Sequence, residues 1–125
     1  MRTFNETPIW SDSLENYRSI IPIFNILERN KYWRLKEQLE SSTGSICDNI
    51  AEGLERPSVK DKIKFLCYAR ASAAESYTQI LRVEMLSLNA PINYQILLEQ
   101  NKNILRQIQG LISYYKQKES KFSSI

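Results

Sequence analysis

The spacing of apolar side chains along the chain predicts four long helices. In four stretches, apolar or small residues recur every three or four positions, the spacing that lines one face of an α-helix. The predicted helices cover residues 12–29, 31–55, 59–87 and 92–118, with irregular segments at residues 1–11 and 119–125. Short connections between helices are typical of antiparallel neighbours. The pattern therefore predicts a single all-α domain over residues 1–125, an antiparallel up-down-up-down four-helix bundle.

The first predicted helix contains a proline, Pro22, which lacks the backbone N–H that a helix interior needs. Apolar residues keep the same helical phase on both sides of it, at Leu14, Tyr17, Ile21 and Phe24. We therefore expect a kinked helix rather than one that begins after the proline.

A tight corner is predicted between the second and third helices. Pro57 cannot continue a helix and disfavours helical geometry at Arg56. Ser58 stands three residues before Asp61, the spacing at which a hydroxyl and a carboxylate can bind the first free amides of a new helix. The second helix should therefore end near Glu55, and the third should begin just after Ser58.

Two polar residues of the second helix, Asn49 and Glu52, need hydrogen-bond partners if the bundle buries them. The candidates are Arg56, Arg70 and Glu75. Because a polar core residue can fix helix register, we prefer this interpretation to a catalytic one. The alternative is a small bundle enzyme with a buried site for a small anion, made by Glu52, Arg70, Glu75 and Arg82.

The residues around the corner resemble those of a known bacterial family. The main matching positions are Asn49, Ile50, Ala51, Glu52, Gly53, Arg56, Ser58 and Glu75. Others lie on both sides, at Gln38, Leu39, Phe65, Leu66, Ala69, Ser72 and Gln79. The pattern is similar to that of the bacterial four helix bundle protein family, which includes the proteins encoded in intervening sequences of large-subunit ribosomal RNA genes. A related branch contains the accessory variability proteins of diversity-generating retroelements.

The resemblance covers roughly residues 14–115. It implies an antiparallel bundle, assembled as a homopentameric ring, with no established catalytic residues. The chain departs from the family after the Gln38-Leu39 pair, where family members often carry two basic residues and this chain has Glu40 and Ser41. A basic surface is therefore not expected on this helix.

Charge is distributed unevenly along the chain. There are seven Lys and Arg against nine Asp and Glu through Arg56, and ten against five from Pro57 onward. A solvated surface is the simpler interpretation of the basic half, and a footprint for RNA or DNA is the alternative. The candidate nucleic-acid-binding residues are Lys60, Lys64, Lys102, Arg106 and Lys116. The last three share a polar stripe of the fourth helix with Gln109 and Ser113.

The third predicted helix has a wider apolar surface than one bundle seam needs. Phe65, Tyr68, Leu81 and Met85 fall where a bundle helix would face water. Contiguous exposed apolar surface marks an interface, so these residues are candidates for contacts in a homo-oligomer.

The composition offers little reactive chemistry. The chain has no histidine, and its two cysteines, Cys47 and Cys67, match no zinc pattern and are expected as buried thiols. We expect no cofactor, no metal and no catalytic residue. No apolar run approaches the roughly 20 residues of a membrane span, and the amino-terminal residues lack the apolar core of a signal peptide, so we expect a cytoplasmic protein.

Together these features favour a non-enzymatic assembly or adaptor protein. Its homo-oligomer would bind a partner protein or a structured nucleic acid, RNA or DNA. One alternative is the bundle enzyme described above, and another is an accessory subunit of a retroelement reverse transcriptase.

Overall fold

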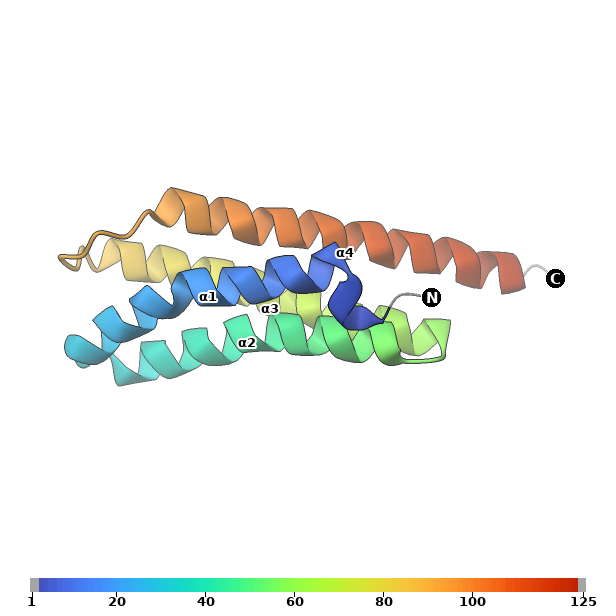
Figure 1. Cartoon of the computed structure of the whole chain (residues 1–125), viewed down its shortest axis with the longest axis horizontal. Helices are drawn as coiled ribbons and strands as arrows, with labels where there is room; N and C mark the ends of the chain where they lie inside the picture. The colour runs from blue at the N-terminus through green and yellow to red at the C-terminus, as the bar shows by residue number, and fades with distance from the viewer. Residues whose placement is uncertain (1–2, 124–125) are drawn as a thin grey trace.

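The computed structural model describes residues 3–123, which form four antiparallel helices (Figure 1). A short 3-10 helix, η1 (Phe4–Glu6), precedes α1 (Pro8–Arg29), α2 (Trp33–Glu55), α3 (Val59–Met85) and α4 (Tyr94–Ser123). Within this part of the chain each helix packs against two others in the cyclic order α1, α2, α3, α4, so α2 and α4 occupy opposite corners. The predicted all-α four-helix bundle is confirmed.

Helix α1 begins at Pro8, four residues earlier than predicted. Proline suits the first position of a helix, because its φ angle is already helical and its missing N–H would have no partner there. The hydroxyl Oγ1 of Thr7 donates to the carbonyl oxygen of Phe4 at 2.6 Å, which joins η1 to the helix. The prediction of an irregular segment over residues 1–11 is therefore wrong from Pro8 onward. Residues 1 and 2 of that segment lie outside the described residues. Pro22 lies inside α1, so the helix does not begin after it.

The end of α1 explains why α2 begins at Trp33 rather than at residue 31. Lys31 has a positive φ angle of 64°. Its N–H donates to the carbonyl oxygen of Glu28 at 3.1 Å, and the N–H of Tyr32 donates to that of Leu27 at 2.8 Å. This pair of bonds is a common way to close a helix around one left-handed residue.

The last connection and the end of α4 also differ from the prediction. Helix α3 ends at Met85, two residues early, and α4 begins at Tyr94, where the Oδ1 of Asn93 accepts from the N–H of Ile96 at 3.2 Å. Helix α4 runs to Ser123, so the tail predicted from residue 119 is helical as far as the structure describes it; residues 124 and 125 lie outside the described residues. The end of α4 projects beyond the α2–α3 corner (Figure 1).

Gly53 brings α2 and α3 into close contact at this corner. A Cβ atom on Gly53 would lie 3.2 Å from the Cβ of Phe65 and 3.3 Å from the carbonyl oxygen of Lys62. These distances leave little room for any side chain. The predicted cap is also present, because the Oγ of Ser58 accepts a hydrogen bond from the N–H of Asp61 at 3.3 Å.

Two apolar clusters fill the bundle, one toward each end. The cluster nearer the corner contains Ile9, Ile46, Ile50, Leu66, Ala69, Ala73, Ile104, Ile108 and Ile112. The other contains Ile20, Ile23, Phe24, Leu27, Leu39, Ile80, Val83 and Leu97. Each helix contributes to both clusters, so the bundle is held together along its length.

The close contact at Gly53 can be tested by adding a side chain. We expect Gly53→Leu to lower the free energy of unfolding by about 1–3 kcal/mol, because the new side chain must displace Phe65 or the backbone at Lys62. Urea unfolding followed by circular dichroism measures this change.

Gly110 provides the matched control, because a Cβ atom there would meet nothing within 4 Å. Gly110→Leu should raise the free energy of unfolding by about 0.5–1 kcal/mol, since leucine favours a helix more than glycine does. Equal effects of the two substitutions would contradict the close contact at Gly53.

Candidate functional site

The run from Asn49 to Gly53 builds the corner and gathers no reactive groups. Ile50 and Gly53 are buried, whereas Asn49 and Ala51 are half-buried. The amide Nδ2 of Asn49 donates to the carbonyl oxygen of Ser45, one turn earlier, at 2.8 Å. The Asn49 side chain therefore bonds within its own helix.

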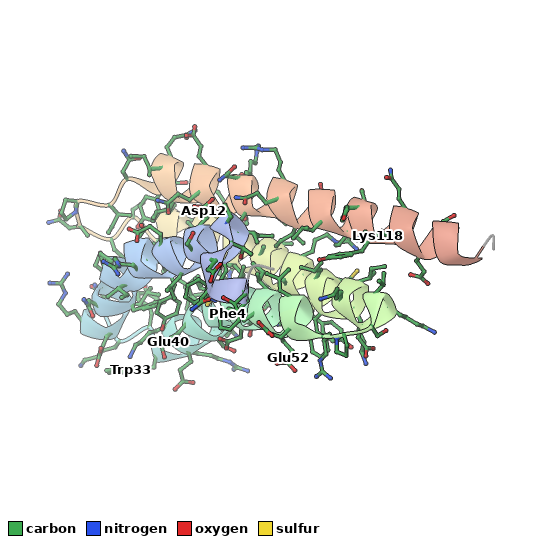
Figure 2. All side chains as sticks on the ribbon, turned by 45° about the vertical axis from the view of Figure 1, so that its right-hand side comes forward. Phe4, Asp12, Trp33, Glu40, Glu52 and Lys118 are labelled. Carbon is green, nitrogen blue, oxygen red and sulfur yellow. The ribbon has the colours of Figure 1, made fainter. Side chains whose placement is uncertain are left out.

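Glu52 and Arg56 form an ion pair on the outer surface of the corner. Arg56 is one of the partners that the sequence predicts for Glu52. Figure 2 shows Glu52 on the outside of the bundle. The guanidinium carbon of Arg56 lies 4.6 Å from the centre of the Phe65 ring. An exposed ion pair contributes roughly 0–1 kcal/mol, so the main effect of Arg56 is to cover the Phe65 ring.

The four residues of the alternative enzyme site do not form a buried anion site. All four of its residues, Glu52, Arg70, Glu75 and Arg82, are exposed. Glu75 accepts a hydrogen bond from the Nε2 of Gln79 at 3.3 Å. The Asn49 side chain is bonded to Ser45 and Glu52 to Arg56, so neither pairs with Glu75 among the described residues. The enzymatic alternative thus loses the charged cluster on which it depended.

Seven buried polar side chains of the described residues, from all four helices, lie between the two apolar clusters. This polar layer consists of Ser13, Asn16, Ser42, Thr43, Ser76, Gln79 and Asn101. Ser42 Oγ donates to Gln79 Oε1 at 2.6 Å, and the hydroxyls of Thr43 and Ser76 lie 3.0 Å apart. These bonds join α2 to α3 at one height of the bundle.

Two acceptors of the polar layer have no hydrogen-bond partner among the described residues, Oδ1 of Asn16 and Oδ1 of Asn101. Their amides do donate, that of Asn16 to Gln100 Oε1 at 3.1 Å and that of Asn101 to the carbonyl oxygen of Ala73 at 3.0 Å. A buried unpaired polar atom costs about 1–3 kcal/mol. The polar layer therefore lowers stability while it fixes the helix register.

The polar stripe of α4 lies on the outside of the bundle, as the sequence predicted. Its five members are exposed, and we call them the basic face: Lys102, Arg106, Gln109, Ser113 and Lys116. Among the residues that the structure describes, no ion pair is formed by its three cations. Lys102 has one aromatic contact, with its Nζ 5.6 Å from the centre of the Tyr77 ring.

The lysines that open α3 have two different roles. Lys60 and Lys64 are exposed at the corner, as expected for a binding surface. Lys62 turns inward, and its Nζ donates to the carbonyl oxygen of Leu54 at 2.8 Å, at the carboxyl end of α2. Burial lowers the pKa of Lys62. Its positive charge lies at the negative end of the α2 dipole, where the last carbonyl groups have no partner within the helix, so this lysine stabilises the fold.

The four apolar residues of α3 do not form one surface. Tyr68 and Met85 are exposed, at 47% and 77%, whereas Phe65 and Leu81 are half-buried. Phe65 and Tyr68 touch, with ring centres 5.6 Å apart. Because a helix turns about 100° per residue, Leu81 and Met85 lie on the other side of the buried face of α3. The structure divides these residues into two separate surfaces.

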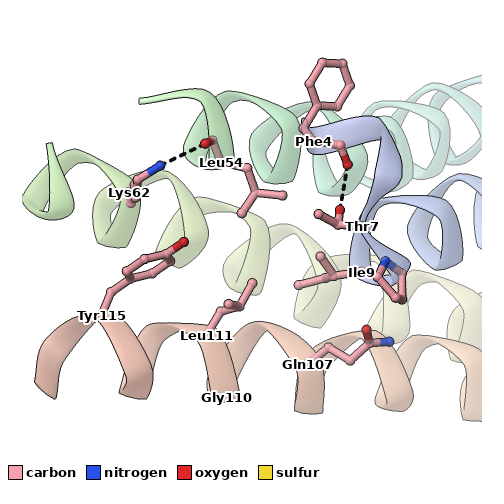
Figure 3. Close-up of a pocket in the computed structure, with 10 residues that line it drawn as sticks. Phe4, Thr7, Ile9, Leu54, Lys62, Gln107, Gly110, Leu111 and Tyr115 are labelled. Atoms are coloured by element: carbon pink, nitrogen blue, oxygen red, sulfur yellow. Dashed lines mark hydrogen bonds between the residues drawn. The ribbon is translucent and has the colours of Figure 1, made fainter. Parts of the chain in front are cut away.

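A cleft of about 640 Å³ lies beside the corner, between the amino-terminal segment, Lys62 and α4 (Figure 3). Ten residues line it: Phe4, Thr7, Pro8, Ile9, Leu54, Lys62, Gln107, Gly110, Leu111 and Tyr115. Among the described residues that line it, none is Asp, Glu or Cys, and the ionisable side chains are those of Lys62 and Tyr115.

Both cysteines are free thiols. Cys47 is buried and its Sγ donates to the carbonyl oxygen of Gly44 at 3.2 Å, while burial raises the pKa of this thiol and makes it a poor nucleophile. Cys67 is a half-buried free thiol. In the described part of the chain, no cluster of three or more His, Cys, Asp or Glu residues could hold a metal ion. None of the helices described here is both long and apolar enough to span a membrane.

Comparison with known proteins identifies a related family. The family model for the 23S rRNA-intervening sequence protein matches residues 5–110, which include α1, α2, α3 and more than half of α4. No curated protein matches the chain.

The cost of the polar layer can be tested at Asn101. We expect Asn101→Leu to raise the free energy of unfolding by about 1–2 kcal/mol, because the substitution removes an unpaired buried acceptor. Asn101→Asp should lower it by about 3 kcal/mol or more, because it places a negative charge beside the carbonyl oxygen of Ala73. Urea unfolding measures both changes. If leucine destabilises the protein as much as aspartate does, the Oδ1 of Asn101 has a partner in solution.

Proposed function

Because the chain belongs to the family of 23S rRNA-intervening sequence proteins, we propose that it is a non-enzymatic, oligomeric adaptor that binds structured nucleic acid. The basic face of α4 is the observation that carries this proposal. It combines three exposed cations with two polar side chains on one helix. Such a surface binds phosphates without any pocket.

The cations of the basic face are arranged in a row. Lys102 and Lys116 are fourteen residues apart in the sequence, which corresponds to about 21 Å along the helix axis. The sequence has no Asp or Glu between Gln100 and Lys118. Glu99 and Glu119 flank the two ends of the row, so its positive potential is strongest around Arg106, and a phosphate backbone can follow it there.

The opposite side of the bundle has the opposite charge. Helix α2 occupies the corner diagonal to α4 and exposes Glu37, Glu40 and Asp48. A polyanion is repelled from this acidic stretch of α2 and attracted to α4. The charge distribution thus favours contact of a nucleic-acid backbone with α4 over contact with residues 37–48 of α2.

Self-assembly is supported by the two separate apolar surfaces of α3. A head-to-tail ring requires two different surfaces on each subunit, whereas a two-fold dimer needs only one. The homopentamer comes from the family resemblance. In a ring the basic faces would act together, because linked binding sites raise the total affinity.

Two other roles stay predictions from the sequence. A protein partner would replace nucleic acid if the basic face binds acidic side chains. The accessory role in a retroelement reverse transcriptase rests only on the resemblance to that branch.

Charge reversal on the basic face tests the proposal. We expect Lys102→Glu, Arg106→Glu and Lys116→Glu together to abolish retention of a structured RNA on the protein at low salt. The wild type should lose affinity as salt rises, with a slope of about −2 to −3 in log K against log salt from these three contacts. Filter binding at several salt concentrations measures both quantities.

The matched control reverses three exposed cations elsewhere, with Arg18→Glu, Arg29→Glu and Arg70→Glu. This variant has the same net charge and should retain more of the RNA than the α4 variant. Equal loss in both variants would assign the effect to net charge, and no RNA retention by the wild type would refute the nucleic-acid proposal.

A further inference from the structure

A second cleft, of about 780 Å³, lies at the end of the bundle away from the corner. It is formed where the α1–α2 connection and the start of α2 meet the end of α3. Leu35 and Leu86 provide apolar lining and pack against the apolar cluster at this end. The floor of the cleft is therefore part of the folded core.

Two aromatic side chains line this cleft and remain accessible. Trp33 is 52% exposed and Tyr32 is 40% exposed. Trp33 projects from the outer surface at the start of α2 (Figure 2). A tryptophan with half its surface in water offers a flat face on which another ring can stack.

Three cations surround the aromatic residues. Lys31, Arg34 and Arg82 line the cleft, and none of the described residues that line it is Asp or Glu. None of the three forms an ion pair within the described residues, whereas nearby Lys36 pairs with Glu28 at 3.5 Å. An anion that enters the cleft would meet uncompensated positive charge from both α2 and α3.

One amide in the cleft also lacks a partner. Gln38 is half-buried, and its side chain makes no hydrogen bond within the part of the chain that the structure describes. A side-chain amide carries both donors and an acceptor, the combination that pairs with the edge of a nucleobase. The cleft therefore offers a stacking face, an amide and cations within one volume.

We propose that this cleft binds an unpaired nucleotide, with its base stacked on Trp33 and its phosphate held by Arg34 and Arg82. A base inside a duplex cannot reach an aromatic face, so the site selects nucleotides in loops, bulges or single strands. This proposal goes beyond the basic face of α4, which contacts phosphates and does not contact bases. The two surfaces use different residues on different helices.

Fluorescence of Trp33 tests the site directly. The chain has two tryptophans, so Trp10→Phe leaves Trp33 as the only reporter. In this background we expect saturable quenching by adenosine monophosphate and by a single-stranded RNA hexamer. A blunt RNA duplex and inorganic phosphate should produce no saturable quenching at the same concentrations. Tighter binding of the hexamer would indicate an RNA ligand, and tighter binding of the mononucleotide would indicate a free nucleotide.

Arg82→Gln should weaken binding of adenosine monophosphate about tenfold, because a charge-assisted hydrogen bond is lost. Arg70→Gln, at an exposed arginine outside both proposed binding surfaces, is the control and should leave this affinity unchanged, with far-UV circular dichroism confirming that both variants are folded. The proposal is overturned by an absence of saturable quenching, by equal quenching with the duplex or with phosphate, or by equal effects of the two substitutions. The triple charge reversal on α4 should leave binding in the cleft intact, so the two proposals can fail separately.

Discussion

The close contact between α2 and α3 at Gly53 is the constraint on which the rest of the bundle depends. A side chain at this position would crowd Phe65 and the backbone of Lys62, so glycine lets the two helices approach this closely without displacing a neighbour. The contact places Lys62 against the carbonyl of Leu54, which closes the end of α2. Helix α4 then packs against α3 and extends past the corner. The most specific stretch of the sequence is therefore explained by packing and not by chemistry.

The interior of the bundle favours a defined arrangement over maximal stability. The polar layer interrupts two apolar clusters and contains acceptors, on Asn16 and Asn101, that have no partner among the described residues. The bonds from Ser42 to Gln79 and between Thr43 and Ser76 join α2 to α3 at one height, and we expect them to favour one register of these helices. A fixed register keeps the surface features of the four helices in constant relative positions. The features suited to binding, the basic face and the cleft at Trp33, both lie on the outside.

The sequence predicts the bundle well because helical periodicity and turn chemistry are local. Pro57 and Ser58 define the corner without any knowledge of the tertiary structure. The predicted start of α1 at residue 12 is four residues late, because Pro8 is compatible with an irregular segment as well as with the first position of a helix, where proline is favoured. The surface features were harder to predict, since they depend on which residues of different helices meet. The cleft at Trp33 joins residues of α2 to Arg82 of α3, and spacing within a single helix gives no signal for that meeting.

The proposed function combines self-assembly with binding of nucleic acid, and one measurement tests both. Light scattering of the purified wild-type protein gives the mass in solution, and the ratio of absorbance at 260 and 280 nm on the same peak reports bound nucleic acid. The proposed function predicts a stable multiple of the 14.7 kDa chain. It also predicts a raised ratio at low salt that falls at moderate salt, as the phosphate contacts of the basic face weaken. A 14.7 kDa monomer with the absorbance ratio of protein alone at low salt would contradict it.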